Sequence, residues 1–269
     1  MIRLVMQNNL ISENDLGQVQ QACKEAGTEV QEIKVVPFSE DIPEFTYNRK
    51  NLYYGSTTLM YNIYNQLRNP IGLFYDHEKY LMSEYLHIWG KRMLNSDATV
   101  MSVGSFIKDW LMMLPPRAWG DTLFVRPNGD GKEFDGQVGT YLEIKTMLER
   151  YMEYDNRLDS ESKIVIGPAY DIHKEWRLYI VGGEIITSSR YRKDFQLSKS
   201  RDDAPEEMLQ FARECFEIHM PHENFAMDIA STHDGEYYII ECGCLNSVGF
   251  YHADINKLFK AIVVWMEKQ

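Results

Sequence analysis

Short apolar runs alternate with stretches of helical spacing over the first quarter of the chain. A run of a few apolar residues is typical of a strand, and apolar residues every three or four positions are typical of a helix. The order strand, helix, strand, strand and helix predicts a small parallel α/β unit. The predicted segments are, in order, residues 1–6, 12–25, 29–36, 51–56 and 57–67.

The middle of the chain is interrupted by proline and glycine. Helical spacing predicts a helix at 78–93, and an apolar run predicts a strand at 98–102. A further helix is expected at 105–113. The pair Pro115-Pro116 then ends this region, because proline cannot continue a helix.

These breaks predict three parts. The first, 1–69, is the α/β domain, the second, 70–116, is a connecting helical region, and the third is 117–269. Strands and helices alternate in the third part. Its predicted elements are a strand at 122–127, a helix at 140–154, a strand at 163–168, a hairpin at 175–192, a helix at 204–218, a hairpin at 224–240 and a helix at 252–268.

The hairpin predicted at 175–192 carries a charged face. Alternation places Glu175 and Arg177 on the face opposite its apolar side chains, and it places Arg190 and Arg192 together on one face further on. The protein as a whole is acidic, so a sheet face with several arginines favours an anionic ligand. An exposed sheet face is also often charged without binding anything.

The second hairpin carries two acids among apolar residues. Asp228 lies inside its first strand and Glu241 at the end of its second. Antiparallel pairing about a short turn would bring the two carboxylates together, and with Asn246 they would form an all-oxygen site suited to Mg²⁺. The alternative is that an acid at a strand end is simply a solvated surface residue.

Residues 128–136 form the most loop-like stretch of the chain, with three glycines. Arg126 precedes this loop and Lys132 lies within it. A flexible glycine-rich backbone with two cations can hold a polyphosphate. The loop lacks the Gly-Lys-Ser/Thr ending of a Walker A motif, and a solvated hairpin loop is the alternative interpretation.

Composition narrows the class of protein. The chain has 269 residues, 44% hydrophobic and 25% charged, with a net charge of −12. A charge of this sign argues against a protein that lies along nucleic acid phosphates. The sequence shows no apolar run long enough for a membrane span and no signal peptide, so we expect a cytoplasmic protein without a membrane partner. Oligomeric state cannot be read from the sequence.

The four cysteines do not form a disulfide framework in a chain of this length. Cys242 and Cys244 could bind a soft metal together with His219, His222 or His252. Their spacing matches none of the usual zinc patterns, which favours small side chains at a strand end. A zinc-binding protein remains a rival interpretation.

The order of these parts resembles the ATP-grasp superfamily, most closely the clade of phage and bacteria in which arginine replaces a usual phosphate-binding lysine. The resemblance covers nearly the whole chain and is most specific after Thr122. It implies an ATP-grasp fold of class α/β (α+β). In this fold a small parallel α/β domain, 1–69, precedes two α+β lobes, 117–269, that grip ATP.

The resemblance also implies roles for individual residues. Arg126 resembles a residue that contacts the nucleotide phosphates, and Lys132 lies in what resembles the mobile loop over the triphosphate. Arg177 resembles the arginine that faces the γ-phosphate, which would make Arg177 and Lys132 catalytic. The strand that resembles the one whose backbone reads adenine contains Ile164, Val165, Ile166 and Gly167.

Asp228, Glu241 and Asn246 resemble the Mg²⁺ ligands of the superfamily. Many members have the asparagine two positions after the glutamate, whereas here it follows five positions later. This departure puts the role of Asn246 in doubt, though not that of Glu241. The first phosphate-binding lysine of the superfamily has only weak candidates in Lys91 and Arg92.

The resemblance implies an ATP- and Mg²⁺-dependent ligase that joins a carboxylate to an amine, or to a thiol, and forms ADP. A small-molecule or peptide carboxylate would attack the γ-phosphate to form an acyl phosphate, which the second substrate then displaces. Arg190 and Arg192 are candidates to hold the acceptor carboxylate. The alternatives are a kinase on the same fold and an ATP-binding module without catalysis.

Overall fold

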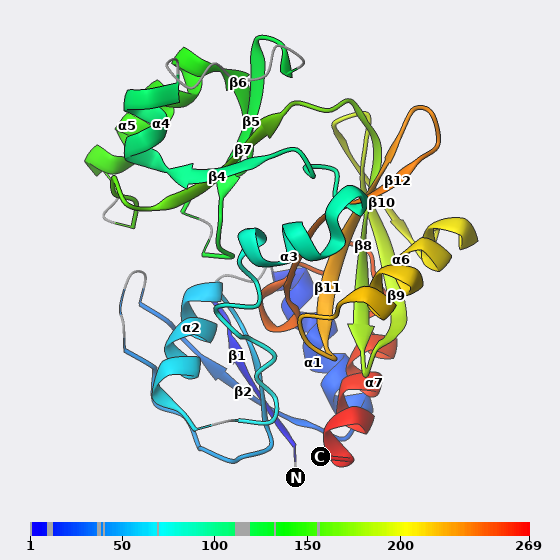
Figure 1. Cartoon of the computed structure of the whole chain (residues 1–269). Helices are drawn as coiled ribbons and strands as arrows, with labels where there is room; N and C mark the ends of the chain where they lie inside the picture. Colours follow the sequence, from blue (N-terminus) through cyan, green and yellow to red (C-terminus); the bar gives the residue numbers. More distant parts are fainter. Residues whose placement is uncertain are drawn as a thin grey trace. The chain divides into compact units, whose positions relative to one another are not determined.

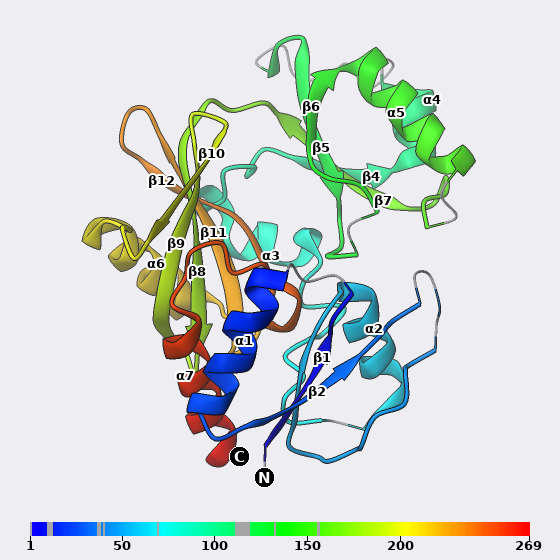
Figure 2. The same cartoon turned by 180° about the vertical axis from the view of Figure 1, so that it is seen from behind.

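The computed structural model describes residues 2–9, 13–36, 39, 41–68, 70–110, 119–131, 133–154 and 157–269. The chain divides into two compact units. The first combines Met1–Tyr80 with Ile172–Gln269, and the second is Leu81–Asp171. Figures 1 and 2 show the elements of each unit from two sides.

The first unit begins with a three-stranded parallel sheet, sheet A. Strand β1 (Arg3–Gln7) lies between β2 (Glu29–Ile33) and β3 (Asn51–Tyr54). Helix α1 (Glu13–Glu25) follows β1, and α2 (Thr57–Gln66) follows β3. This arrangement confirms the small parallel α/β unit that the hydrophobic pattern predicts.

The first unit also contains a five-stranded antiparallel sheet, sheet B, in the order β10-β9-β8-β11-β12. Helix α6 (Glu206–Ile218) joins β10 to β11, the short η4 (Leu245–Ser247) follows β12, and α7 (Ile255–Glu267) ends the chain. The strands are β8 (Ile172–Val181), β9 (Glu184–Lys193), β10 (Gln196–Arg201), β11 (Phe225–Thr232) and β12 (Tyr237–Cys244).

The two faces of sheet B have different partners. Helix α6 packs on one face, where the rings of Phe216 and Phe225 lie 5.5 Å apart. On the other face, Tyr179 and Val181 belong to the core that includes α7, α1 and sheet A. Figures 1 and 2 both show α7 beside α1. Alternation along β8 therefore places Arg177 on the α7 face, next to the end of the apolar core.

The second unit is built on a four-stranded antiparallel sheet, sheet C, in the order β4-β7-β5-β6. Its core includes Ile164 and Ile166 of the central strand β7. The strands are β4 (Thr99–Ser102), β5 (Thr122–Pro127), β6 (Gln137–Thr140) and β7 (Lys163–Pro168). The helices are α3 (Met82–Trp89), η1 (Gly90–Arg92), α4 (Val103–Asp109) and α5 (Tyr141–Tyr154).

Two strands and one helix differ from the sequence-based expectations. Strands β6 and β10 lie outside the predicted segments because neither carries a buried side chain, so neither shows apolar alternation. Helix α3 is shorter than the helix predicted at 78–93. The Asp76 carboxylate accepts the backbone N–H of Glu78 in a turn before it, and Gly90 ends it with a φ of 52°.

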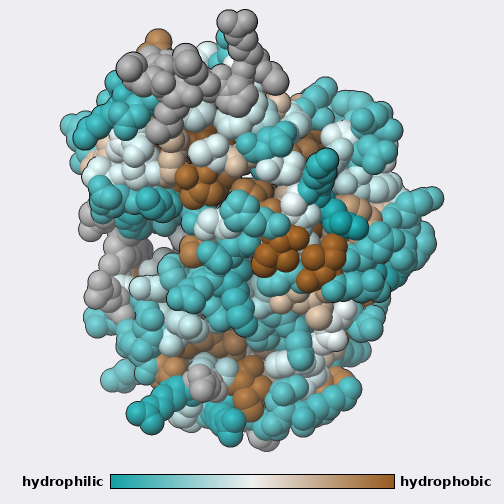
Figure 3. Space-filling model, viewed as in Figure 1, coloured by the Kyte–Doolittle hydropathy of each residue, from teal (hydrophilic) through white to brown (hydrophobic). Residues whose placement is uncertain are grey.

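The proposed division into 1–69, 70–116 and 117–269 stays a prediction, since residues 69 and 116 to 117 lie outside those that the structure describes. No helix in the described part of the chain is long and apolar enough to span a membrane. Hydrophilic residues cover most of the face shown in Figure 3, in keeping with a charged content of 25%.

Gly72 belongs to the segment after α2 that runs beside strand β3. It forms an isolated bridge with Leu52, and its carbonyl accepts the backbone N–H of Tyr53. A Cβ atom at Gly72 would overlap the carbonyl oxygen of Asn51 and approach the Leu52 Cα to 2.6 Å. These are backbone atoms that cannot rotate away, so only glycine fits this position.

We expect Gly72→Ala to lower the free energy of unfolding by about 1–3 kcal/mol, because backbone must shift to admit the methyl group. Gly17→Ala is the matched control. Gly17 lies in α1 with nothing within 4 Å of an added Cβ, so alanine there should stabilise by roughly 0.5–1 kcal/mol. Urea unfolding of both variants measures the difference, and an equal effect at the two positions would contradict this account.

Candidate functional site

Three charged residues lie in a row across the middle of sheet B. The register of β8, β11 and β12 places Asp228 directly opposite Arg177 on one side and Glu241 on the other. Directly opposed residues of antiparallel strands project from the same face. The pairing expected between the two acids of the second hairpin is therefore present, with an arginine added to it.

Arg177 and Asp228 form a buried, two-pronged ion pair. The guanidinium Nε donates to Oδ1 at 2.7 Å and Nη2 donates to Oδ2 at 2.8 Å. The side chain of Asp228 is only 4% exposed and that of Arg177 11%. Glu241 is more open, at 34%, and its Oε1 lies 3.9 Å from the same Nη2. Bidentate geometry of this kind fixes both partners in orientation.

Two tyrosines and a second ion pair surround this pair. The hydroxyl of Tyr191 lies 2.8 Å from Oε2 of Glu175 and 3.1 Å from Oδ2 of Asp228. Arg192 donates to the other oxygen of Glu175 at 3.1 Å. Tyr251 stacks on Tyr191, with ring centroids 4.8 Å apart. The cluster thus joins two acid–arginine pairs through one phenol.

Burial controls the protonation of this cluster. Removal from water is the largest effect on Asp228 and raises its pKa, while the charge and hydrogen bonds of Arg177 oppose that rise. Burial alone would lower the pKa of Arg177, but the charge and hydrogen bonds of Asp228 hold it well above its ordinary value. Arg177 therefore stays charged, and it is the group that favours the ionised form of Asp228.

The guanidinium of Arg177 also lies against aromatic rings. Its central carbon is 5.2 Å from the ring centre of Tyr251 and 5.8 Å from that of Tyr191. A planar guanidinium is held well by such faces. Within the described residues, its Nη1 has no hydrogen-bond partner, so the arginine keeps donor capacity for an anion.

Asn246 lies in η4 and is only 2% exposed. Its Oδ1 accepts the backbone N–H of Phe74 at 2.6 Å. Its Nδ2 donates to the carbonyls of Tyr53 at 2.7 Å and Gly72 at 2.9 Å. The whole amide therefore binds η4 to β3 and to the segment that runs beside it. Coordination of a metal by Oδ1 would compete with these contacts.

The expectation that Arg190 and Arg192 share a face is wrong. Their partners on β8 are the consecutive residues Trp176 and Glu175, so Tyr191 is an extra residue in a β-bulge. Arg192 contacts Glu175 on the charged face. Arg190 lies on the face of Trp176, where it contacts Asp203 at 2.8 Å.

In the second unit, Arg126 lies on β5 and its Nε donates to the carbonyl of Pro127 at 3.1 Å. The glycine-rich loop follows β5 and joins it to β6 as a hairpin. The base of the loop is fixed because the side chain of Asn128 accepts the backbone N–H of Ser83 at 2.8 Å, near the start of α3. Lys132 lies outside the described residues.

Strand β7 occupies the interior of sheet C and pairs with β4 and β5. In a strand paired on both sides, the backbone groups are used by the ladders. The predicted adenine contacts of Ile164, Val165, Ile166 and Gly167 would therefore compete with the sheet. Strand β7 ends at Pro168, and the backbone groups after it are not part of the hydrogen-bond ladders of sheet C.

Lys91 and Arg92 lie in η1, directly after α3, and both are exposed. They project from the surface of the second unit. Neither makes an ion pair with another described residue that would fix its direction.

A family model described as an ATP-grasp domain, the third family of its clade, matches residues 87–262. The chain belongs to this family. Membership confirms the resemblance to the ATP-grasp superfamily that the order of its strands and motifs indicates. No curated protein sequence matches the chain significantly.

Solved structures show the same ATP-grasp fold. D-cycloserine synthetase DcsG superposes with a TM-score of 0.68 at 14% identity, covering 100% of this chain and 99% of that one. D-alanine–D-alanine ligase from Bacillus anthracis gives 0.60 at 14% identity, with 99% and 97% covered. The macrocyclase MdnC from Microcystis aeruginosa, bound to its precursor peptide, gives 0.61 at 13% identity, with 98% and 99% covered.

Some residues of the charged cluster on sheet B could not be predicted from the sequence. Tyr191 and Tyr251 belong to no motif, and their stacking depends on a bulge and on a left-handed residue, since Tyr251 has a φ of 53°. Glu175 is visible as an acid on the Arg177 face, but its burial and its contact with Tyr191 follow only from the fold.

We expect Asn246→Ala to lower the free energy of unfolding by at least about 2 kcal/mol, because it leaves the buried N–H of Phe74 without its acceptor. Asn256→Ala, an exposed amide in α7, is the control and should change stability by no more than about 0.5 kcal/mol. Thermal unfolding of both variants makes the comparison. Unchanged stability of Asn246→Ala with a raised Mg²⁺ requirement would instead indicate a metal ligand.

Proposed function

We propose that the protein is an ATP- and Mg²⁺-dependent ligase that joins a carboxylate to an amine or thiol and releases ADP. One observation carries the proposal. An ATP-grasp domain brings together, on one sheet face, the carboxylates of Asp228 and Glu241 and the guanidinium of Arg177. These are the groups that the transfer of a phosphoryl group requires, namely ligands for a hard cation and a cation for the phosphate.

The pair of acids fits Mg²⁺. Both carboxylates project from the same face, and Glu241 is exposed enough to accept an ion from solvent. Among the described residues, Oδ2 of Asp228 accepts two hydrogen bonds but Oδ1 accepts only one, which leaves it a lone pair. Hard oxygen ligands and a partly open position suit Mg²⁺, which keeps several waters.

The charge of the cluster supports the same ion. Three carboxylates, on Glu175, Asp228 and Glu241, face two guanidinium groups, on Arg177 and Arg192. With all five groups ionised, the cluster would carry a formal excess of one negative charge, part of it out of water. A divalent cation would compensate the acids, and bound Mg²⁺ supplies the charge that makes a γ-phosphate open to attack by an anion. The amide of Asn246 is committed to backbone, so it stands outside the proposed metal ligands.

Arg177 would hold the transferred phosphoryl group. Asp228 fixes its direction, the rings of Tyr191 and Tyr251 limit its movement, and Nη1 keeps donor capacity. A cation placed in advance stabilises developing charge without a cost of reorganisation. A substrate carboxylate would then form an acyl phosphate, and the second substrate would displace phosphate from it.

Residues of the second unit enter the proposal through the family resemblance. Arg126 would contact the phosphates, and Lys132 would lie over them in the glycine-rich loop. The fixed base of that loop at Asn128 and its glycines are consistent with a segment that moves between two anchored strands. For the adenine we favour the backbone after Pro168 over that of Ile164–Gly167, because the latter serves sheet C.

The substrates would be a small molecule or a peptide with a carboxylate and an amine. The names of similar structures support both, since one is a D-alanine–D-alanine ligase and another is a macrocyclase bound to a precursor peptide. Arg192 is the better candidate for an acceptor carboxylate, because it lies half-exposed on the charged face. Arg190 is tied to Asp203 on the other face. A cytoplasmic location remains an expectation from the sequence.

The reaction can be tested by measuring ADP release from Mg²⁺-ATP across pooled carboxylic acids, peptides and amines, with mass spectrometry of the active pools. We expect a product with the mass of acid plus amine minus water, formed together with ADP and phosphate. A phosphorylated acceptor without a condensed product would establish a kinase. Tight ATP binding with no ADP release in any pool would establish a binding module. Either result would overturn the ligase proposal.

The metal ligands can be tested in the same assay. We expect Asp228→Asn and Glu241→Gln each to lower ADP release roughly a hundredfold or more, because each removes charge that holds Mg²⁺. Glu236→Gln is the matched control, since Glu236 is an exposed acid in the turn of the same hairpin, and it should keep full activity. Full Mg²⁺-dependent turnover by the Asp228 and Glu241 variants would refute the assignment.

A further inference from the structure

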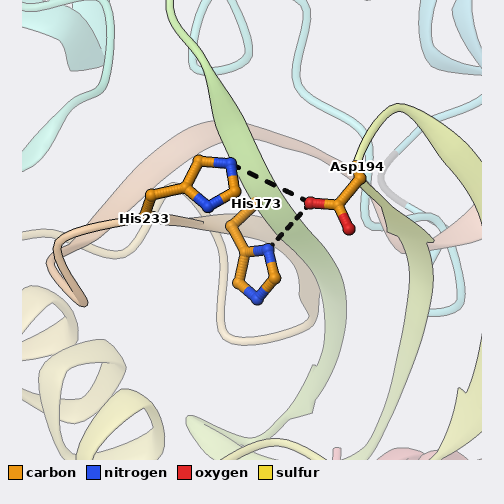
Figure 4. A group of neighbouring side chains, drawn as sticks. All are labelled: His173, Asp194 and His233. Carbon is orange, nitrogen blue, oxygen red and sulfur yellow. Dashed lines mark hydrogen bonds and ion pairs between the residues drawn. The ribbon is translucent and has the colours of Figure 1, made fainter.

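Two histidines and an aspartate meet at one end of sheet B, away from the acidic pair. His173 lies at the start of β8, Asp194 in the turn between β9 and β10, and His233 in the turn between β11 and β12. Figure 4 shows the two imidazoles and the Asp194 carboxylate that both approach. Within the described residues, this is the one group of three or more His, Cys, Asp or Glu that could hold a metal.

The distances suit one small ion. Nδ1 of His173 lies 2.8 Å from Oδ1 of Asp194, and Nε2 of His233 lies 3.9 Å from the same oxygen. One ligand atom from each residue lies within 4.8 Å of the others. In a tetrahedral zinc site, bonds of about 2.0–2.2 Å put neighbouring ligand atoms roughly 3.3–3.6 Å apart. The two distances to Asp194 lie on either side of that value and the remaining separation is within 4.8 Å, so side-chain shifts of about 1 Å or less would complete the geometry.

The backbone holds the three residues in place without a metal. The N–H of Asp194 donates to the carbonyl of His173 at 2.8 Å, and Asp194 takes a left-handed φ of 47°. His173 is the extra residue of a β-bulge opposite β11, and a bulge redirects its side chain. The turn that carries His233 is closed by hydrogen bonds at Thr232, whose backbone N–H donates to the carbonyl of Glu236 at 3.1 Å.

We propose that His173, Asp194 and His233 form a binding site for Zn²⁺ or a similar divalent transition-metal ion. Neutral imidazoles and a carboxylate are ligands for such ions, whereas Mg²⁺ prefers oxygen alone. The side chains are 30%, 51% and 56% exposed, in the order given, so the ion would enter from solvent and keep a water as a further ligand. Such a site with three protein ligands is open rather than closed.

This site differs from the zinc site that the cysteines suggest. Cys242 and Cys244 are both buried, and neither belongs to a group of three ligands among the described residues. It also differs from the acidic pair, because His173 precedes Arg177 by four positions on β8, which is about 13 Å along a strand. The two proposed metal sites therefore differ in their ligands. One offers only oxygen atoms, which suit Mg²⁺, and the other offers two imidazole nitrogens and a carboxylate, which suit Zn²⁺.

A bound ion would join three separate connections of sheet B. The residues come from the start of a strand and from two turns. Asp194 lies 21 positions after His173, and His233 lies 39 positions after Asp194. The ion would bind the folded arrangement more tightly than the unfolded chain, so stability would rise with the logarithm of its free concentration once that exceeds the Kd. It would also hold the start of β8, the strand with which the chain re-enters the first unit after Asp171.

The test is a calorimetric titration of the 269-residue chain with Zn²⁺ alone, without nucleotide. We expect one site, and we expect His173→Gln, Asp194→Asn and His233→Gln each to weaken its affinity at least about tenfold. His87→Gln is the matched control, since His87 is an exposed histidine of α3 in the other unit. Glu241→Gln is the second control and should bind Zn²⁺ as the original protein does, which separates this site from the proposed Mg²⁺ site.

Thermal unfolding gives a second measure that does not depend on enzymatic activity. Zn²⁺ should raise the Tm of the original protein and of both controls but not that of the three ligand variants. Without zinc, these variants should unfold close to the original protein, because all three side chains are partly exposed. Absence of Zn²⁺ binding, equal binding by the ligand variants, or its loss in Glu241→Gln would each overturn the proposal.

Discussion

The buried ion pair between Arg177 and Asp228 is the interaction around which the charged face of sheet B is built. An isolated charge in this position would be costly, and removing one partner would leave the other uncompensated. The hydroxyl of Tyr191 lies between the carboxylates of Asp228 and Glu175, and Arg192 compensates the charge of Glu175. An arrangement this costly for stability alone is better explained by a ligand, since charges oriented in advance can stabilise a phosphoryl group.

The shifted asparagine has a structural explanation. In a chain where the asparagine follows the acid by two positions, both side chains would lie on the same strand face. Here the chain leaves β12 at Cys244 and enters η4 before Asn246, which turns the amide away from the sheet face and toward sheet A. The amide then joins the two sheets of the first unit. Metal binding would rest with Asp228, Glu241 and water.

Much of the fold could be predicted because buried faces of helices and strands produce a periodic pattern of apolar residues in the sequence. The parallel unit at the start of the chain and the hairpin at 175–192 follow from such patterns, and the structure confirms both. The family match confirms the resemblance that the order of the parts and motifs indicates. The exposed strands β6 and β10 show no such pattern. The site is harder to predict, since the sequence indicates that Asp228 and Glu241 lie together but gives neither the ion pair between Asp228 and Arg177 nor the contacts of Asn246.

The error of prediction at Arg190 and Arg192 arises where the sheet is irregular. Pairing shifts by one residue at Tyr191 and at Ile240, beside the charged face, and at His173, at the end of sheet B. One extra residue reverses the face of everything beyond it, which is why Arg190 and Arg192 separate. The same irregularities direct Tyr191 at Asp228 and bring His173 to Asp194. A regular sheet would have been easier to predict, but it could not have placed these side chains together.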